Sequence, residues 1–163
     1  MSTANVKANL ADHLAINLLL NRYTDAVNRR DWATLADVFT EDGIWDVGGP
    51  EAGPMKYYFS GRDQLVGSIR GMIEAMSMLV QTNHAPVIQV NGSRATATST
   101  MDEKARTADG EQCIHLIGTY YDDIVRENDG EWRFKKRTFR ITYLGQPKYD
   151  GQVMARFPVA RPA

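Results

Sequence analysis

The histidines are the side chains of this sequence best suited to move a proton near neutral pH. His84 precedes Ala85-Pro86 on a predicted strand, where a proline indicates a sheet edge or a bulge. There His84 could act as a general base, or it could hydrogen-bond a neighbouring carbonyl and do no chemistry. His115 alternates with Cys113 on another predicted strand, so it could share a cavity with His84 or be a structural histidine. His13, near the start of a predicted helix, is expected to be exposed to solvent.

These side chains do not suggest a metal or redox site. Cys113 is the single cysteine, so an internal disulfide is impossible and a cysteine-type metal site would lack its other ligands. We expect Cys113 to be a small buried hydrophobic residue in a strand. The histidines have no nearby acidic triad at ligand spacing. The sequence therefore predicts neither a metal nor a cofactor.

Length and charge narrow the classes of partner. The chain has 163 residues, a single-domain length, and its formal net charge is -1. Nucleic acid and anionic membranes are therefore poor partner candidates. Residues 1–9 contain no apolar signal-like region, and no stretch approaches the roughly 18 apolar residues of a membrane span. We expect a cytoplasmic protein with no membrane partner.

The candidate residues must be positioned by helices in the first half of the chain. Apolar residues recur at helical spacing over residues 16–27, which predicts a helix with one face in the core. They are Ile16, Leu19, Leu20, Tyr23 and Val27. Tyr23 either packs in that core or presents its hydroxyl to a ligand. Asp31 is placed to cap a short second helix that runs to about Phe39, and a third helix is predicted to follow Gly61.

The rest of the chain shows strand patterns separated by turn signals. Short strands at 44–47 and 55–59 flank a Gly- and Pro-rich segment, 48–54, that could form a flap. Four longer strands are predicted at 78–90, 94–105, 111–127 and 131–143, with turns at Asn91-Gly92, Asp109-Gly110 and Asn128-Asp129-Gly130. On the second of these strands one face consists of Ala95, Ala97, Ser99 and Met101. The basic run Lys135-Lys136-Arg137 is expected to be a solvated edge.

This order of elements predicts an α+β fold. We expect a cone-shaped, curved antiparallel sheet with three N-terminal helices packed on its concave face. The space between the two layers would hold a small ligand. Residues 1–145 would form a single domain, and 146–163, which contain three prolines, an irregular C-terminal tail.

Three local patterns carry a resemblance to a known family. They are Tyr23 to Trp32 followed by Leu35, Phe39 and Asp42-Gly43, then Phe59-Ser60-Gly61-Arg62, then Asp129-Gly130-Glu131-Trp132-Arg133-Phe134. In this order the sequence resembles the SnoaL-like branch of the nuclear transport factor 2-like superfamily, over nearly the whole chain to Gly145. The resemblance implies the cone fold but no single chemistry. This fold hosts dehydratases, isomerases, cyclases, epoxide hydrolases, dioxygenase small subunits and binding proteins.

The layout is most similar to the dehydratase and dehydrochlorinase members of that branch. In those enzymes, the resemblance implies, a histidine on the first long strand is the general base. An aspartate at the end of the first helix and a tyrosine before it assist. His84 matches the histidine and Tyr23 the tyrosine, whereas Asn28 stands at the aspartate position. An asparagine could orient the imidazole ring, but it would not raise the ring's basicity as a carboxylate does.

By this resemblance His84, Tyr23 and Asn28 would be the catalytic group of a cofactor-independent lyase (dehydratase) or isomerase that acts on a hydrophobic, ring-containing small molecule. Substrate contacts are expected at Trp45, Tyr57, Phe59, Met76, His115 and Arg140. The chain would pair as a homodimer through the open sheet face. Two alternatives stay open: a non-catalytic small-molecule-binding protein, and the small subunit of an aromatic-ring-hydroxylating dioxygenase.

Overall fold

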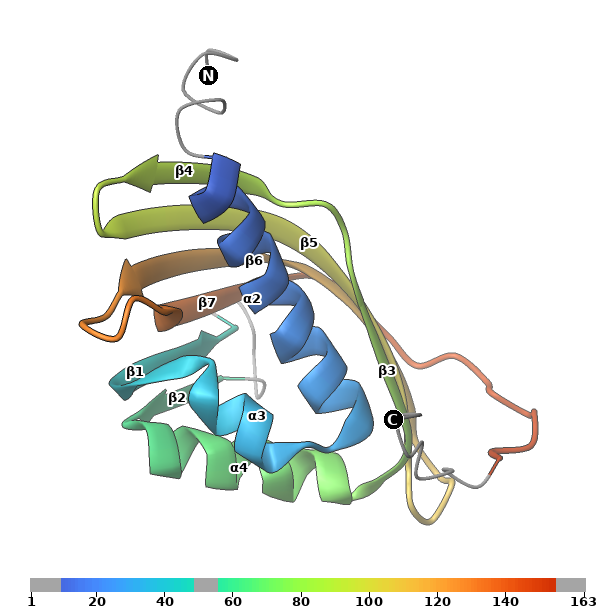
Figure 1. Ribbon diagram of the computed structural model, residues 1–163. Helices are drawn as coiled ribbons and strands as arrows, with labels where there is room; N and C mark the ends of the chain where they lie inside the picture. Colours follow the sequence, from blue (N-terminus) through green and yellow to red (C-terminus); the bar gives the residue numbers. More distant parts are fainter. Residues whose placement is uncertain (1–9, 49–55, 155–163) are drawn as a thin grey trace, which may run out of the picture.

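The chain folds into a layer of helices against a curved sheet, which the computed structural model describes over residues 10–48 and 56–154. The helices in these ranges are α2 (Leu10–Arg29), α3 (Trp32–Asp37) and α4 (Arg62–Glu74). The strands are β1 (Phe39–Val47), β2 (Tyr57–Ser60), β3 (Met76–Asn83), β4 (Val87–Asn91), β5 (Arg94–Thr107), β6 (Cys113–Arg126) and β7 (Trp132–Gly145). The sheet wraps around the helices, so the predicted α+β cone is confirmed (Figure 1).

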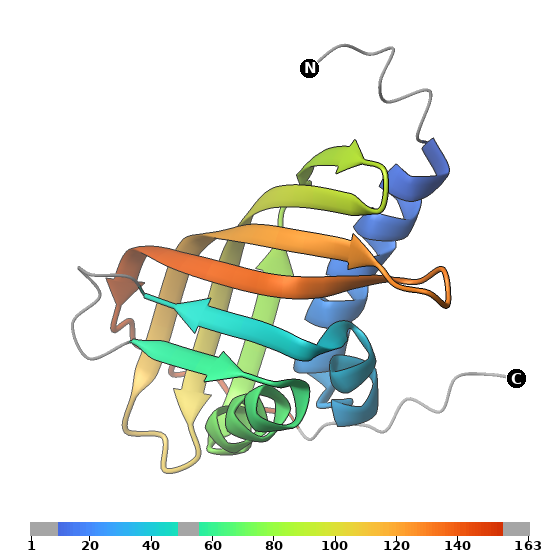
Figure 2. The same cartoon turned by 90° about the vertical axis from the view of Figure 1, so that its left-hand side faces the viewer.

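The sheet is mixed, whereas the sequence predicted antiparallel strands throughout. Its strand order is β2-β1-β7-β6-β5-β3, and β4 pairs with the part of β5 that β3 leaves free. All the pairs are antiparallel except β1 with β7, which run parallel. A tight hairpin imposes antiparallel pairing, but β1 and β7 are separated by most of the chain, so no hairpin joins them. Figure 2 shows β1 between β2 and β7.

Two local interactions fix the link between α2 and α3. Arg30 adopts a left-handed conformation with φ of 59°, and the backbone N–H of Asp31 donates to the Ala26 carbonyl at 2.9 Å, so α2 ends in a Schellman-type turn. The Asp31 carboxylate then accepts from the backbone N–H of Thr34 at 3.0 Å, which is the predicted cap of the second helix. The Arg30 side chain also donates to the Met76 carbonyl, so this turn is attached to β3.

Strand β1 begins at Phe39, earlier than the predicted 44. The segment 41–43, just after the predicted end of the second helix at about Phe39, lies inside this strand, where the register against β7 shifts between Phe39 and Ile44. A β-carbon on Gly43 would lie 3.0 Å from the Thr40 carbonyl oxygen. Glycine at position 43 therefore allows the backbone to pass close to the Thr40 carbonyl at this irregularity of the strand, and it does not end a helix.

The later strands follow the predicted turns. The first predicted long strand is interrupted next to Pro86, which divides it into β3 and β4. Gly92, Gly110 and Gly130 have φ values of 61°, 77° and 87°, the left-handed conformation that such turns require. Residues 146–154, the described part of the predicted tail, form neither helix nor strand. Apart from Gly48, the predicted flap lies outside the described residues.

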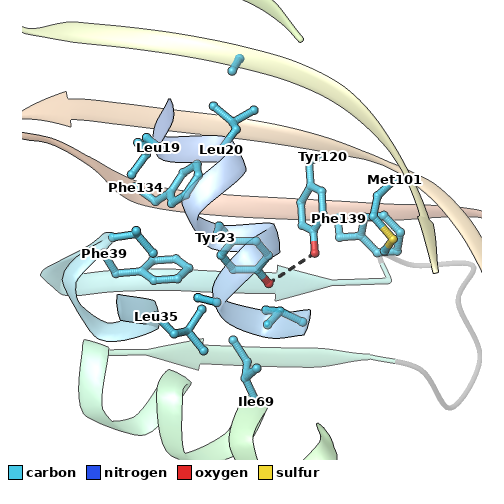
Figure 3. Close-up of a cluster of buried hydrophobic side chains, with 14 of the residues drawn as sticks. Leu19, Leu20, Tyr23, Leu35, Phe39, Ile69, Met101, Tyr120, Phe134 and Phe139 are labelled. Atoms are coloured by element: carbon cyan, nitrogen blue, oxygen red, sulfur yellow. Dashed lines mark hydrogen bonds between the residues drawn. The ribbon is translucent and has the colours of Figure 1, made fainter. Parts of the chain in front are cut away.

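The core lies between α2 and the concave face of the sheet. Helix α2 buries the predicted stripe together with Ala26. The Tyr23 ring packs edge-to-face against Phe39 and Phe134, with each pair of centroids 6.0 Å apart (Figure 3). None of the described helices is long and apolar enough to cross a membrane. The aromatic packing fixes the position of Tyr23 within the cone.

Candidate functional site

A cavity of about 350 Å³ opens between α2, α4 and the concave face of the sheet. Its wall is mostly apolar, with side chains from both helices and from six strands, including Val27, Ile69, Met72, Leu79, Met101 and Phe139. A larger and more open depression of about 690 Å³ lies along β4, β5 and β6, but Arg94, Asp123 and Lys135 line it. The apolar cavity is the better site for a small organic molecule, because such sites combine an apolar wall with a few polar groups.

Glu103 supplies the carboxyl group of the cavity wall. It continues the inward-facing side of β5 beyond Ser99 and Met101, both buried. Gln81 lies opposite Glu103 on β3, and its Nε2 donates to Glu103 Oε2 at 2.6 Å. Burial raises the pKa of Glu103, and the hydrogen bond from Gln81 offsets only part of this rise. A carboxyl group of this kind can take up and release a proton closer to neutral pH.

Asn28 holds the backbone of Gln81. Its Nδ2 donates to the Gln81 carbonyl at 2.9 Å, and its Oδ1 accepts from the Gln81 N–H at 2.7 Å. Strand β3 is the last strand of the sheet on this side, so the asparagine amide takes the place of a neighbouring strand. The same residue therefore fixes the position of the side chain that binds Glu103.

The Tyr23 and Tyr120 hydroxyls meet at the cavity wall, 3.5 Å apart (Figure 3). Burial raises the pKa of both phenols, so both stay protonated near neutral pH. Behind the two rings lies Arg137, whose Nε and Nη2 donate to the two carboxylate oxygens of Asp122 at 2.9 and 3.1 Å. The predicted solvated edge is thus wrong for Arg137, whose side chain is 1% exposed.

Several predicted contact residues meet at this cavity. Tyr23, Trp45, Tyr57 and Met76 all line it. Phe59 is not among the lining residues, but it lies beside Trp45 in the β1–β2 pair and stacks on Trp45 and Tyr57, with ring centroids 6.1 and 6.3 Å apart. Four of the predicted site residues therefore line one cavity, and Phe59 packs against two of them.

His84 does not lie in this cavity. It is exposed in the link between β3 and β4, where its backbone N–H donates to the Thr100 carbonyl at 2.9 Å. On β3 the inward side chains are Leu79 and Gln81, so a residue at an even position such as His84 falls on the other face. The geometry does not support His84 as the base for a ligand in the cavity.

His115 and Arg140 also lie outside the cavity wall. His115 Nε2 is 3.1 Å from Asp102 Oδ1, and its ring packs edge-to-face against Tyr143. Arg140 donates to the two carboxylate oxygens of Asp46 at 3.2 and 3.3 Å. Both residues alternate with buried neighbours on their strands, so they face away from the helices.

The sequence interpretation missed Gln81, Glu103, Tyr120, Asp122 and Arg137. One signal could have found Glu103, because the strand face that carries Ala95 to Met101 reaches it two positions after Met101. A buried arginine in a run of three basic residues carries no comparable signal. In the described ranges, 10–48 and 56–154, no group of three or more His, Cys, Asp or Glu side chains is arranged to hold a metal ion.

Comparison with known families gives a match along most of the chain. A family described as SnoaL-like domain matches residues 8–138. None of the curated proteins matches the sequence.

Solved structures share the fold at low sequence identity. A candidate scytalone dehydratase from Novosphingobium aromaticivorans is 24% identical, with a TM-score of 0.75 over 97% of this chain and 99% of that chain. A candidate aromatic ring hydroxylase from the same species is 22% identical, with a TM-score of 0.74 over 85% and 94%. A hexachlorocyclohexane dehydrochlorinase from Novosphingobium barchaimii is 18% identical, with a TM-score of 0.74 over 91% and 97%. At these identities the likeness shows the fold alone.

Proposed function

The chain belongs to the SnoaL-like domain family, in the nuclear transport factor 2-like superfamily, and on this premise we propose that it is a cofactor-independent lyase or isomerase. Its substrate is an apolar, ring-containing small molecule bound in the cone. The observation that carries the proposal is the carboxyl group of Glu103 on a mostly apolar wall. Neighbours named as a scytalone dehydratase and a dehydrochlorinase support the reaction class.

Glu103 is the group that transfers the proton. Gln81 binds its Oε2, which leaves Oε1 to act on the ligand. As a carboxylate, Glu103 removes a proton from a carbon atom next to a carbonyl. As an acid it then returns that proton to another carbon atom of the enolate, which completes an isomerisation, or to a departing hydroxyl group, which leaves as water and completes a dehydration. Tyr23 donates a hydrogen bond to the oxygen that gains negative charge, and Asn28 positions the reaction centre through the Gln81 backbone.

The decisive variants are Glu103→Gln and His84→Ala. Ligands are first found by thermal shift with a panel of ring ketones, polyketide-like phenols, and hydroxylated and chlorinated rings, and each hit is followed for conversion by mass spectrometry. Glu103→Gln should lose conversion by at least about 10²-fold while its thermal shift with the ligand is retained. His84→Ala should keep both. Conversion by Glu103→Gln at the wild-type rate, or its loss in a folded His84→Ala, would return the role of base to His84.

A non-catalytic binding protein is the second candidate. It is favoured by the mostly apolar wall, which has no histidine among its lining residues in the described part of the chain. This candidate predicts the same ligand affinity in wild type and Glu103→Gln, with no conversion by either. The dioxygenase small subunit predicts co-purification with an iron-containing large subunit, and a stable homodimer without that subunit would exclude it.

A further inference from the structure

A buried cation lies directly behind the polar end of the cavity. The side chains of Arg137 and Asp122 are 1% and 0% exposed. A buried ion pair contributes little to stability in comparison with an apolar pair of the same volume, because both charges must leave water. Its position relative to the ligand cavity is therefore the more informative property.

The Arg137 guanidinium stacks on three aromatic rings. Its central carbon lies 3.8 Å from the Tyr120 centroid, 4.1 Å from that of Tyr23 and 4.3 Å from that of Phe134. Tyr23 and Tyr120 line the cavity, and Arg137 does not. The cation therefore acts on a ligand through the two phenol rings rather than by contact.

The two phenol hydroxyls have room for one more partner. For each hydroxyl, the other is its only hydrogen-bond partner within the described residues, and the oxygen–oxygen distance of 3.5 Å makes this bond a long one. Hydroxyls at this separation can both donate to a single acceptor oxygen placed about 2.8 Å from each. The pair therefore forms a ready site for one ligand oxygen.

The charges around the pair favour negative charge on that oxygen. Burial raises the pKa of Tyr23, the Arg137 cation opposes this rise, and the carboxylates of Glu103 and Asp122 add to it with smaller effects. For Tyr120 burial is again the largest cause, and Arg137 again acts in the opposite direction. Arg137 thus opposes the rise in pKa of both phenols. Its counter-ion Asp122 has the smaller effect on the pKa of Tyr23.

We propose that Arg137 is a positioning residue that polarises Tyr23 and Tyr120 into a paired donor site for a negatively charged ligand oxygen. The cavity consequently selects phenols and enolisable ring carbonyls over hydrocarbons of the same shape. This inference specifies the substrate class of the proposed function. It rests on the proposed function only in assuming that the ligand binds in the same cavity. It does not require proton transfer by Glu103.

The first test compares 2-naphthol with naphthalene, which differ by one hydroxyl group, by titration calorimetry or ligand fluorescence. Tyr120→Phe and Tyr23→Phe each remove one donor and leave the ring. Each should weaken 2-naphthol about tenfold and leave naphthalene unchanged, because one hydrogen bond to the ligand oxygen is lost. Equal losses for both ligands, or no loss for 2-naphthol, would overturn the proposal.

The second test addresses Arg137 itself. The double variant Asp122→Asn with Arg137→Gln removes both charges and keeps similar shapes, which avoids an unpaired buried charge. Across a series of substituted phenols, affinity should rise with phenol acidity in wild type and rise much less in the double variant. Arg137→Lys, which keeps the charge, should recover part of the slope. A merely structural arginine would shift all affinities together and leave the slope unchanged.

Glu103→Gln separates this proposal from the proposed function. If the cavity is a phenol site, this variant should keep the preference for 2-naphthol over naphthalene whether or not the protein turns over a substrate. If wild type binds neither ligand, or binds both equally, the paired donor site is wrong, whatever the role of Glu103.

Discussion

The two faces of the sheet hold the same kind of ion pair in opposite surroundings. On the concave face Arg137 pairs with Asp122, and the two side chains are 1% and 0% exposed. On the outer face Arg140 pairs with Asp46, and the two side chains are 39% and 19% exposed. Both arginines belong to β7. The face of the strand, and not the residue type, decides which arginine is next to the cavity.

The difference between the two faces explains why the proposed proton-transfer residue is Glu103 and not His84. His84 and His115, the residues that suit proton transfer by type, lie away from the cavity wall, whereas Glu103 and Tyr120 line it. The type of a residue decides whether its side chain can transfer a proton. The face of the strand on which it lies decides whether that side chain can reach a ligand in the cavity.

The largest difference is expected in stability. Arg137→Met leaves Asp122 as an uncompensated buried charge, which should lower the free energy of unfolding by about 3–5 kcal/mol. Arg140→Met breaks an exposed pair and should cost less than about 1 kcal/mol. Urea denaturation of both variants at neutral pH measures the two effects. Similar losses for the two variants would mean that burial does not separate the pairs.

The two faces should also respond to pH with opposite signs. Burial raises the pKa of Asp122 from 3.8 to about 6, although Arg137 opposes the rise. Between about pH 4 and 6 the folded chain keeps a proton that the unfolded chain has released, so the contribution of Asp122 to the free energy of unfolding falls as pH rises. Partial burial raises the pKa of Asp46, but hydrogen bonds from Arg140 and Lys136 outweigh this and hold it below its ordinary value. Its contribution is lost as pH falls.

This pH effect can be isolated with the variant in which Asp122 and Arg137 are both neutral. The difference in unfolding free energy, wild type minus variant, should decrease by up to about 3 kcal/mol between pH 4 and pH 6.5, at about 1.4 kcal/mol for each unit of pKa shift. Urea titrations across this range measure it. An increase with pH would mean that Arg137 holds the pKa of Asp122 below its ordinary value.

A smaller effect is expected at the edge of the concave face. Asn28→Ala removes both hydrogen bonds to the Gln81 backbone and should cost about 2 kcal/mol, because two buried backbone groups lose their partner. Asn21→Ala, on the exposed side of the same helix, removes only a bond to Asn17 and should change stability by less than about 0.5 kcal/mol. Hydrogen exchange at the Gln81 amide should accelerate in Asn28→Ala alone. Unchanged exchange there would show that the clamp is not formed in solution.

Much of the fold was predictable because local signals and global packing agree. The stripe from Ile16 to Val27, the cap at Asp31 and the turn glycines each act within a few residues, and each is found in the structure. The parallel pairing of β1 with β7 was not predictable in this way. It joins segments that are far apart in sequence and depends on how the whole sheet assembles.

The sequence predicted part of the cavity wall and Tyr23, but not the polar groups of Gln81, Glu103 and Tyr120. Trp45, Tyr57 and Met76 are large apolar residues beside predicted cavity elements, and they line the cavity. The role of His84 was inferred from the family resemblance, but His84 lies just after the end of β3 and close to Pro86. At such a point a shift of one residue in the strand alternation turns a side chain to the other face of the sheet. Arg137 was assigned by its basic neighbours, which carry no information about the opposing Asp122.

The attachment of α2 to β3 also bears on self-association. An uncovered edge strand offers free N–H and C=O groups to any other extended chain, which is a common route to aggregation. Here the Asn28 amide occupies both groups of Gln81, and Arg30, in its left-handed turn, occupies the Met76 carbonyl. The end of one helix thus closes the edge at two points along β3. Substitutions at these two residues should therefore be watched for fibril formation as well as for activity.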